Sequence, residues 1–389
     1  MLGGVRVLDL TDETGFLAGK ILGDMGADVI KIEPPGGDPA RRRGPFLGGV
    51  EDPERSLLWL AMNTSKRGVT LDLESDAGRA SFRALAAGAD VVLETAPPGA
   101  MDDKGIGPRT LREIAPRLVY CAITPFGQSG PYAQYAAHDL VVVAMGGNAA
   151  ATGDPDRPPV RCTMPTGYYH AAPEAALGVA MALYARETTG RGQLVDISMH
   201  ECQLQSLLSF PGQYAVTGRL QRRLGPRIGR TREIWRARDG FVTFGLRGGP
   251  SRVRNIVAMV EHMSELGEAP EWMRATRWDE YDHNALGDDD IARLEGAFGA
   301  FFARRTMREL YEVALERRIL LAPCNDAKEI LEQPQLRARE LFVTIDYPEL
   351  GAAIEHPAFF ARSNVAADAV RIRSRAPRLG EHNDEVLGG

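Results

Sequence analysis

The sequence predicts an α/β protein with a larger domain built on a doubly wound parallel sheet and a smaller α/β domain late in the chain. Two observations carry this prediction. Short apolar runs alternate with helical patterns through the first 125 residues, which is the rhythm of βαβ units. The texture then changes near Arg223, where an Arg-rich linker leads into a mixed segment.

Five apolar runs of the first part are predicted to be strands: Val5–Leu10, Asp28–Glu33, Val69–Leu73, Asp90–Glu94 and Leu118–Pro125. Between them, apolar residues recur on one helical face, first at Leu17, Ile21, Leu22 and Met25, then at Phe82, Leu85 and Ala86. Ligands of doubly wound sheets bind beyond the carboxyl ends of the strands. The loops 34–39 and 94–99 fall there and are the expected ligand loops.

The later elements complete the domain plan. An Ala-rich helix is expected from His170 to Glu187, and the turn 189–192 stops it before a strand at 193–198. A strand at 239–244 opens the smaller domain. We expect a large domain over 1–222, a small domain over 223–326, and a C-terminal segment, 327–389, that returns to the large domain.

Composition and charge exclude several classes of protein. The chain has 389 residues, 44% of them hydrophobic and 25% charged, which is ordinary for a globular protein. A net charge of -6 argues against nucleic-acid binding. No GxGxxG follows the first strand, so simple NAD chemistry loses its main support. The four cysteines are far apart and no metal-ligand spacing occurs. No long apolar run or leader pattern is present, so we expect a cytoplasmic protein that does not enter membranes.

Several short motifs, in order along nearly the whole chain, resemble the family III CoA-transferases (CaiB/BaiF, the carnitine and bile-acid type), which are related to the 2-methylacyl-CoA racemases. No single motif is decisive, but coincidence in this order is improbable. The motifs are Gly4–Leu10, Gly26–Glu33, Gly36–Arg41, Asn63 with Lys66 before Leu71–Leu73, Thr189–Gln193, Asp239–Val242, Ala322–Asn325 with Pro334–Arg339, and Leu379–His382.

The resemblance implies a fold and a ligand. It implies a Rossmann-like large domain completed by the C-terminal segment, an inserted small domain, and an intertwined dimer. It also implies coenzyme A or acyl-CoA as substrate, with no tightly bound cofactor. By position, Arg41 and Lys66 match basic residues near the CoA phosphates.

The loop after the fourth strand is the other part of the implied CoA site, and it departs from the family pattern. The usual Glu-Asn-Phe is Glu94-Thr95-Ala96 here, which removes an aromatic ring. A basic position downstream is Asp103, next to Lys104. Thr95, Ala96 and Lys104 are therefore the expected CoA contacts on this loop.

The family nucleophile is missing. Transferases of this family use an Asp carboxylate that forms an anhydride and then an aspartyl-CoA thioester. That Asp precedes the Thr of the TGRGQ turn by about 21 residues in transferases and about 22 in racemases, which gives Tyr168 or Gly167 here. A phenol is a poor substitute for a carboxylate, and a positive φ at Gly167 would explain a glycine there. The nearest acids, Asp156 and Glu174, are not obvious replacements.

A second candidate feature survives at His138 and Asp139. Ala137–Leu140 resembles the Gly-His-Asp of the racemases, in which the His is one of two bases, and Asp139 also matches an acidic active-site position of transferases. Imidazole suits proton transfer at neutral pH. The second racemase base would come from the position of Gly167, which has no side chain.

Three hypotheses stay open. The chain is a CoA-transferase subunit, in a homodimer or in a heterodimer with a paralogous partner that carries the Asp. It is an isomerase, racemase or lyase acting on acyl-CoA through His138 and Asp139. Or it is a non-catalytic acyl-CoA-binding protein. The transferase hypothesis includes a carboxylic acid as acceptor.

Overall fold

The computed structural model describes residues 1–364 and 369–388 and divides the chain into two compact units. The larger unit comprises 1–149, 161–220 and 334–389, and the smaller comprises 150–160 and 221–333. Positions 365–368 and 389 of the expected C-terminal segment lie outside the described residues.

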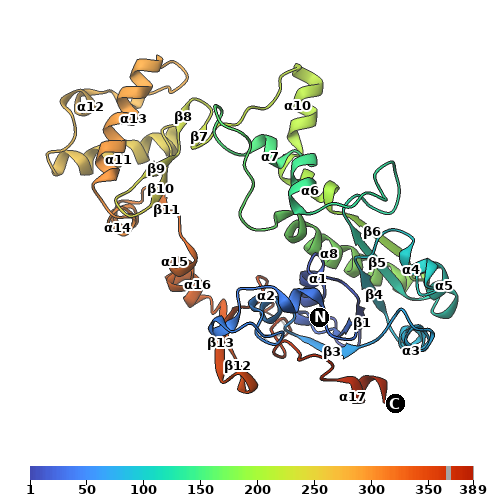
Figure 1. Cartoon of the computed structure of the whole chain (residues 1–389). Helices are drawn as coiled ribbons and strands as arrows, with labels where there is room; N and C mark the ends of the chain where they lie inside the picture. Colours follow the sequence, from blue (N-terminus) through green and yellow to red (C-terminus); the bar gives the residue numbers. More distant parts are fainter. Residues whose placement is uncertain (365–368, 389) are drawn as a thin grey trace. The chain divides into compact units, whose positions relative to one another are not determined.

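A parallel sheet of six strands forms the centre of the larger unit (Figure 1). The strand order β3-β2-β1-β4-β5-β6 reverses direction between β1 and β4, and all five strand pairs are parallel. This is the doubly wound arrangement predicted from the sequence. The strands are β1 (Arg6–Asp9), β2 (Asp28–Glu33), β3 (Lys66–Thr70), β4 (Val91–Glu94), β5 (Val119–Thr124) and β6 (Leu194–Ser198).

Helices cover both faces of this sheet, as the near-continuous burial of its central strands β2, β4 and β5 requires. Apolar residues of α1 and α8 pack with alternate strand residues into one core, and those of α3 and α5 pack into another on the opposite face. The helices of this unit before the tail are α1 (Phe16–Asp24), α2 (Leu57–Met62), α3 (Asp76–Ala87), α4 (Ala100–Asp103), α5 (Pro108–Ile114), α6 (Asp139–Met145), α8 (Thr166–Thr189), α9 (Met199–Cys202) and α10 (Ser209–Thr217).

Two predicted boundaries were wrong. The third strand is Lys66–Thr70 rather than Val69–Leu73, because a buried lysine opens it and hides the apolar pattern. The long helix begins at Thr166 rather than His170, so Gly167 and Tyr168 lie in its first turn, and it continues through Pro173.

The C-terminal tail returns to the larger unit. Asn383 and His382 accept hydrogen bonds from the backbone of β3. The Pro377 carbonyl oxygen accepts a hydrogen bond from Trp59 Nε1 at 3.0 Å. The elements here are α16 (Pro334–Ala338), β12 (Phe342–Tyr347), β13 (Ala352–Pro357) and α17 (Asn383–Leu387).

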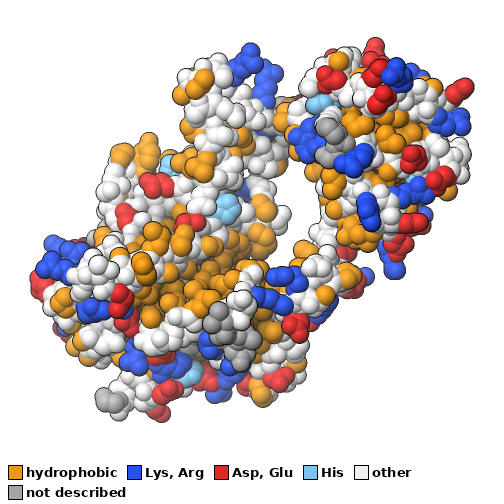
Figure 2. Space-filling view, turned by 180° about the vertical axis from the view of Figure 1, so that it is seen from behind, with side chains coloured by type: hydrophobic (Ala, Val, Ile, Leu, Met, Phe, Trp, Pro, Cys, Tyr) orange, Lys and Arg blue, Asp and Glu red, His pale blue; other side chains and the backbone are white. Residues whose placement is uncertain are grey.

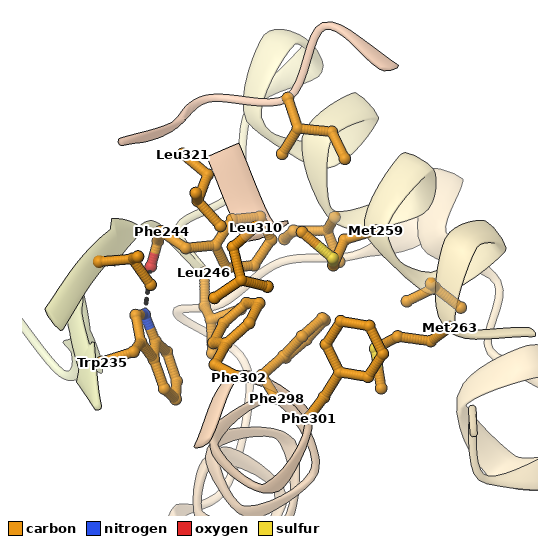
Figure 3. Close-up of a cluster of buried hydrophobic side chains, with 14 of the residues drawn as sticks. Trp235, Phe244, Leu246, Met259, Met263, Phe298, Phe301, Phe302, Leu310 and Leu321 are labelled. Carbon is orange, nitrogen blue, oxygen red and sulfur yellow. Dashed lines mark hydrogen bonds between the residues drawn. The ribbon is translucent and has the colours of Figure 1, made fainter. Parts of the chain in front are cut away.

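The smaller unit has its own core, in which Phe244, Phe298 and Phe302 pack around Trp235 and Met259 (Figure 3). Trp235 Nε1 donates to the carbonyl oxygen of Phe244 at 2.6 Å. Its elements are β7 (Arg227–Ile228), β8 (Thr231–Arg232), β9 (Ile234–Arg236), β10 (Phe241–Phe244), α11 (Pro250–Glu265), α12 (Glu271–Ala275), α13 (Asp288–Ala303), α14 (Met307–Arg317), β11 (Leu321–Pro323) and α15 (Ala327–Glu332); α7 (Asn148–Ala151) crosses the boundary between units.

Candidate active site

The first turns of α6 and α8 are held together by a reciprocal pair of hydrogen bonds. The Gly167 backbone N–H donates to Asp139 Oδ1 at 2.7 Å, and the Asp139 N–H donates to Tyr168 Oη at 3.1 Å. Helix N-termini present N–H groups without partners inside the helix, so each bond satisfies one of them. Asp139 and Tyr168, both singled out from the sequence, therefore lie in one cluster.

Asp139 Oδ1 occupies the space that a side chain at position 167 would need. A Cβ built on Gly167 would lie 3.0 Å from that oxygen. The expected positive φ at Gly167 is wrong, because this glycine is an ordinary helical residue and does not adopt the left-handed conformation. The absence of a side chain at position 167 lets the Asp139 carboxylate approach the helix backbone closely.

Neither of the two residues expected at the family nucleophile position supplies an anion. Gly167 has no side chain, and burial raises the pKa of the Tyr168 phenol above its ordinary value, so the phenol stays protonated at neutral pH. Glu174 lies two turns along α8. Burial of the Cys202 thiol raises its pKa to about 11, and the charge of Glu174 adds to this effect. Asp156 is exposed and belongs to the smaller unit.

Asp139 is the carboxylate that remains in the cluster. Its side chain is 11% exposed, and Oδ2 lies 3.9 Å from Arg161 Nη1. With one oxygen bonded to Gly167 and the other facing a guanidinium, it is placed to hold the two helices. His138 precedes it and is exposed, and within the described residues its side chain makes no hydrogen bond.

The loop after β1 acts electrostatically on the same cluster. After burial, the charges of Glu13 and Asp12 contribute to raising the pKa of Tyr168. Glu13 also pairs with Arg43, which connects this loop to the loop after β2. Glu13 and Arg43 were not predicted from the sequence, although their position after predicted strands could have indicated them.

Arg41 is buried in an ion-pair network. Its side chain is 1% exposed, Nε and Nη2 donate to the two oxygens of Glu33 at 2.6 and 2.8 Å, and Nη1 donates to Glu54 at 3.0 Å. The guanidinium stacks on Trp59, with its carbon 3.8 Å from the ring centre. In this structure Arg41 has no side that is free for a phosphate.

Lys66 is equally enclosed. Its ammonium donates to Asp9 Oδ2 at 2.8 Å, to the Phe16 carbonyl oxygen at 2.9 Å and to Asn63 Oδ1 at 2.9 Å. Burial lowers the pKa of Lys66 to about 8. Burial opposes ionisation of Asp9 as well, but the charges of Lys66 and Lys31 keep its pKa below the ordinary value. This cluster joins β1, β3 and the start of α1.

Thr95 and Ala96 lie where the strand order reverses. Thr95 Oγ1 accepts a hydrogen bond from the Asp12 N–H at 3.0 Å, which links the loops after β1 and β4. The Ala96 N–H donates to the Glu94 carboxylate, and burial raises the pKa of Glu94 to about 8. Lys104, at the end of α4, pairs with Glu74 and is one-third exposed.

The described residues contain no cluster of His, Cys, Asp and Glu that could hold a metal ion. Among the helices of that same part of the chain, none is long and apolar enough to cross a membrane.

The fold and this cluster define a class of protein: a doubly wound α/β protein with a polar site at the carboxyl ends of its strands. The chain belongs to CoA-transferase family III, whose sequence profile matches residues 2–383. This confirms the resemblance noted in the sequence. Enzymes of this family use CoA thioesters as substrates.

Curated relatives include subunits of named CoA-transferases. The chain is 32% identical to the succinyl-CoA:(R)-benzylsuccinate CoA-transferase subunit BbsE of Thauera aromatica, over 98% of this chain and 92% of that protein. It is 33% identical to succinyl-CoA–D-citramalate CoA-transferase of Chloroflexus aurantiacus, over 99% and 93%. The succinyl-CoA–L-malate CoA-transferase alpha subunit of Chloroflexus aurantiacus is 29% identical, over 99% and 88%.

Solved structures show the same fold. A CaiB/BaiF family protein from Brucella suis superposes with a TM-score of 0.83 at 27% identity, over 100% of this chain and 98% of that one. The protein Rv3272 of Mycobacterium tuberculosis gives a TM-score of 0.76 at 26% identity, over 99% and 98%.

Proposed function

We propose that this chain is the subunit of a two-subunit CoA-transferase that lacks the nucleophile, and that a paralogous partner carries the catalytic Asp. One observation carries the proposal: at the family nucleophile position the chain has Gly167 and Tyr168, and the space beside Gly167 is filled by Asp139 Oδ1. Two relatives named as subunits support it.

In this proposal the chain binds the acyl-CoA thioester, and the loops after β2 and β4 form its CoA site. Thr95, the Ala96 backbone and Lys104 contact the coenzyme from the second loop. Arg41 and Lys66 support the site without contacting the coenzyme, because their ion pairs with Glu33 and Asp9 hold the loops that form it. Arg42, exposed next to Arg41 with one bond to the Gly36 carbonyl oxygen at 3.2 Å, presents a guanidinium of this loop to phosphate.

The acceptor in this proposal is a carboxylic acid and the donor is succinyl-CoA, the donor named for several relatives. The protein works in the cytoplasm and holds no tightly bound cofactor. Its partner covers apolar surface of the larger unit in an intertwined heterodimer. Apolar side chains gather on that unit (Figure 2), and exposed Leu177, Met181 and Tyr184 of α8 are candidates for this contact.

The alternative with His138 and Asp139 as an isomerase pair has less support. A two-base mechanism needs a second base, and the position that would supply it is Gly167. Asp139 is engaged with the Gly167 N–H and lies near Arg161.

The test is coexpression of the chain with each similar chain encoded beside it, followed by native mass spectrometry and an assay of CoA transfer from succinyl-CoA. The proposal expects a complex with a chain that has Asp at the position matching Tyr168, and transfer only by the complex. Transfer by the chain alone would contradict it. Turnover of an acyl-CoA by the chain alone without an acceptor acid would favour the isomerase. A chain that binds CoA and gives no turnover with any partner would be a binding protein.

A further inference from the structure

A cavity of about 630 Å³ opens on the smaller unit, between α11 and the turn from α14 into β11. A second pocket of about 150 Å³ adjoins it and shares Asn255 and Leu320 with it. Cavities of this size are typical of small-molecule sites. The lining combines an apolar wall with several guanidinium groups.

Two of these guanidinium groups, those of Arg254 and Arg318, are exposed and form no ion pair with any described residue. The other arginines differ. Arg317, also in the lining, is bonded to both oxygens of Glu265, and Arg252, which lines the adjoining pocket, lies 3.6 Å from Glu233. Two guanidinium groups of the larger cavity therefore have no ion-pair partner among the described residues.

Two carboxylates also line the cavity, those of Glu261 and Asp279. Asp279 pairs with Arg277 at 3.4 Å. Glu261 is exposed and forms no ion pair within the described residues, so the lining holds one unpaired carboxylate against two unpaired guanidinium groups.

Arg318 stands where the backbone favours glycine. It caps the C-terminus of α14 in the left-handed conformation, with φ of 55°, a position at which glycine is common because it has no Cβ. The local fold therefore does not call for an arginine here, and the side chain adds a charge to the cavity.

The apolar wall includes Leu320, which is 67% exposed. Its backbone N–H donates to Asn255 Oδ1 at 2.8 Å, so the turn that presents it is fixed. Val253, Val257 and Ala258 line the cavity from α11. Met259 of the same helix and Leu321, the next residue after Leu320, point into the core of Figure 3 and anchor both sides.

We propose that this cavity binds an organic carboxylate with an apolar body. The carboxylate contacts the guanidinium groups of Arg254 and Arg318, which suit planar anions, and the apolar body lies on Leu320 and Val257. The site consists only of residues of the smaller unit and is independent of the CoA-transferase proposal.

Ligand-observed NMR titration of the whole chain with 4-phenylbutyrate tests this proposal. The neutral 4-phenylbutyramide controls for apolar contact, and CoA controls for an anion that comes from phosphate. Arg318→Gly removes the guanidinium at a position where glycine is favoured, so folding is not at risk. Arg308→Gln is the matched control, because Arg308 is an exposed arginine of α14 paired with Glu312, outside the lining.

The proposal expects 4-phenylbutyrate to bind and the amide to bind at least about tenfold more weakly, as for loss of a charged hydrogen bond. Arg318→Gly and Arg254→Gln should each weaken binding by a similar factor, and Arg308→Gln should leave it unchanged. Equal binding of acid and amide, an unchanged affinity in Arg318→Gly, or no binding at millimolar concentration would overturn it. The proposal would also be overturned if CoA binds, 4-phenylbutyrate does not, and CoA binding is lost in Arg318→Gly and Arg254→Gln.

Discussion

Replacement of Arg41 by alanine should destabilise the larger unit far more than it disturbs any ligand. The substitution removes both bonds to Glu33, the bond to Glu54 and the stacking on Trp59. It leaves the Glu33 carboxylate, whose side chain is 0% exposed, with the Asp38 N–H at 3.0 Å as its remaining donor.

The magnitude follows from the uncompensated charge. Removal of one partner of a buried ion pair costs about 3 to 5 kcal/mol. Arg41 Nη2 also donates to the Pro377 carbonyl oxygen at 3.1 Å, so the C-terminal tail should loosen together with the loop after β2. Arg41→Lys keeps the charge but loses the paired hydrogen bonds to Glu33, so its stability should lie between that of the unsubstituted chain and that of Arg41→Ala.

Hydrogen exchange read by mass spectrometry measures this effect unit by unit, which matters because a chain of two units need not unfold in one step. Peptides covering 29–42 and 374–382 should lose protection by at least about a hundredfold, since 1.36 kcal/mol corresponds to a factor of ten. Peptides of α13, in the smaller unit, serve as the internal control. Arg42→Ala, an exposed neighbour, should change stability by less than about 0.5 kcal/mol. If Arg41→Ala keeps full protection and only CoA affinity falls, Arg41 is a phosphate ligand and the structural role inferred here is wrong.

Three further predictions concern the candidate site. Tyr168→Asp should form more covalent adduct with succinyl-CoA, seen by intact-protein mass spectrometry, than Gly167→Asp, because a Cβ at 167 would lie 3.0 Å from Asp139 Oδ1; equal adduct in both variants would refute this steric argument. Asp139→Ala should lower the free energy of unfolding, measured by urea denaturation, by about 1 to 3 kcal/mol. Asp139→Asn can still accept the hydrogen bond from the Gly167 N–H and should lower it by less. Equal decreases in the two variants would show that this bond contributes nothing. Burial raises the pKa of Glu94 to about 8, so the folded state holds this proton more tightly than the unfolded state does. The free energy of unfolding should therefore fall as pH rises from about 5 to about 8. Denaturation of Glu94→Gln across that range should lack this decrease, and a pH dependence equal to that of the unsubstituted chain would contradict the assignment.

The sheet was predictable because its strands are apolar runs. The second strand was predicted with its observed bounds, Asp28–Glu33, and the strands at 91–94 and 119–124 agree within one residue at each end. The third strand was misplaced because Lys66, buried against Asp9, interrupts the pattern that identifies strands.

The environment of the site residues could not be predicted, because it depends on contacts that are distant in sequence. Arg41 looked like a surface phosphate ligand, and its bonds to Glu54 and to the Pro377 carbonyl oxygen became visible only in the fold. Asp139 was found by its motif, but its bond to Gly167, 28 residues away, was not predictable from either position.

The central claim, that this chain lacks its own nucleophile and works with a partner, is tested most directly by trapping the acyl-enzyme. Hydroxylamine added during turnover of succinyl-CoA by the coexpressed complex, followed by peptide mapping of both chains, identifies the acylated carboxylate. The account predicts a modified Asp in the partner and none in segment 160–175 or at Asp139 of this chain. A modified Asp139 or Glu174, with transfer by this chain alone, would contradict it.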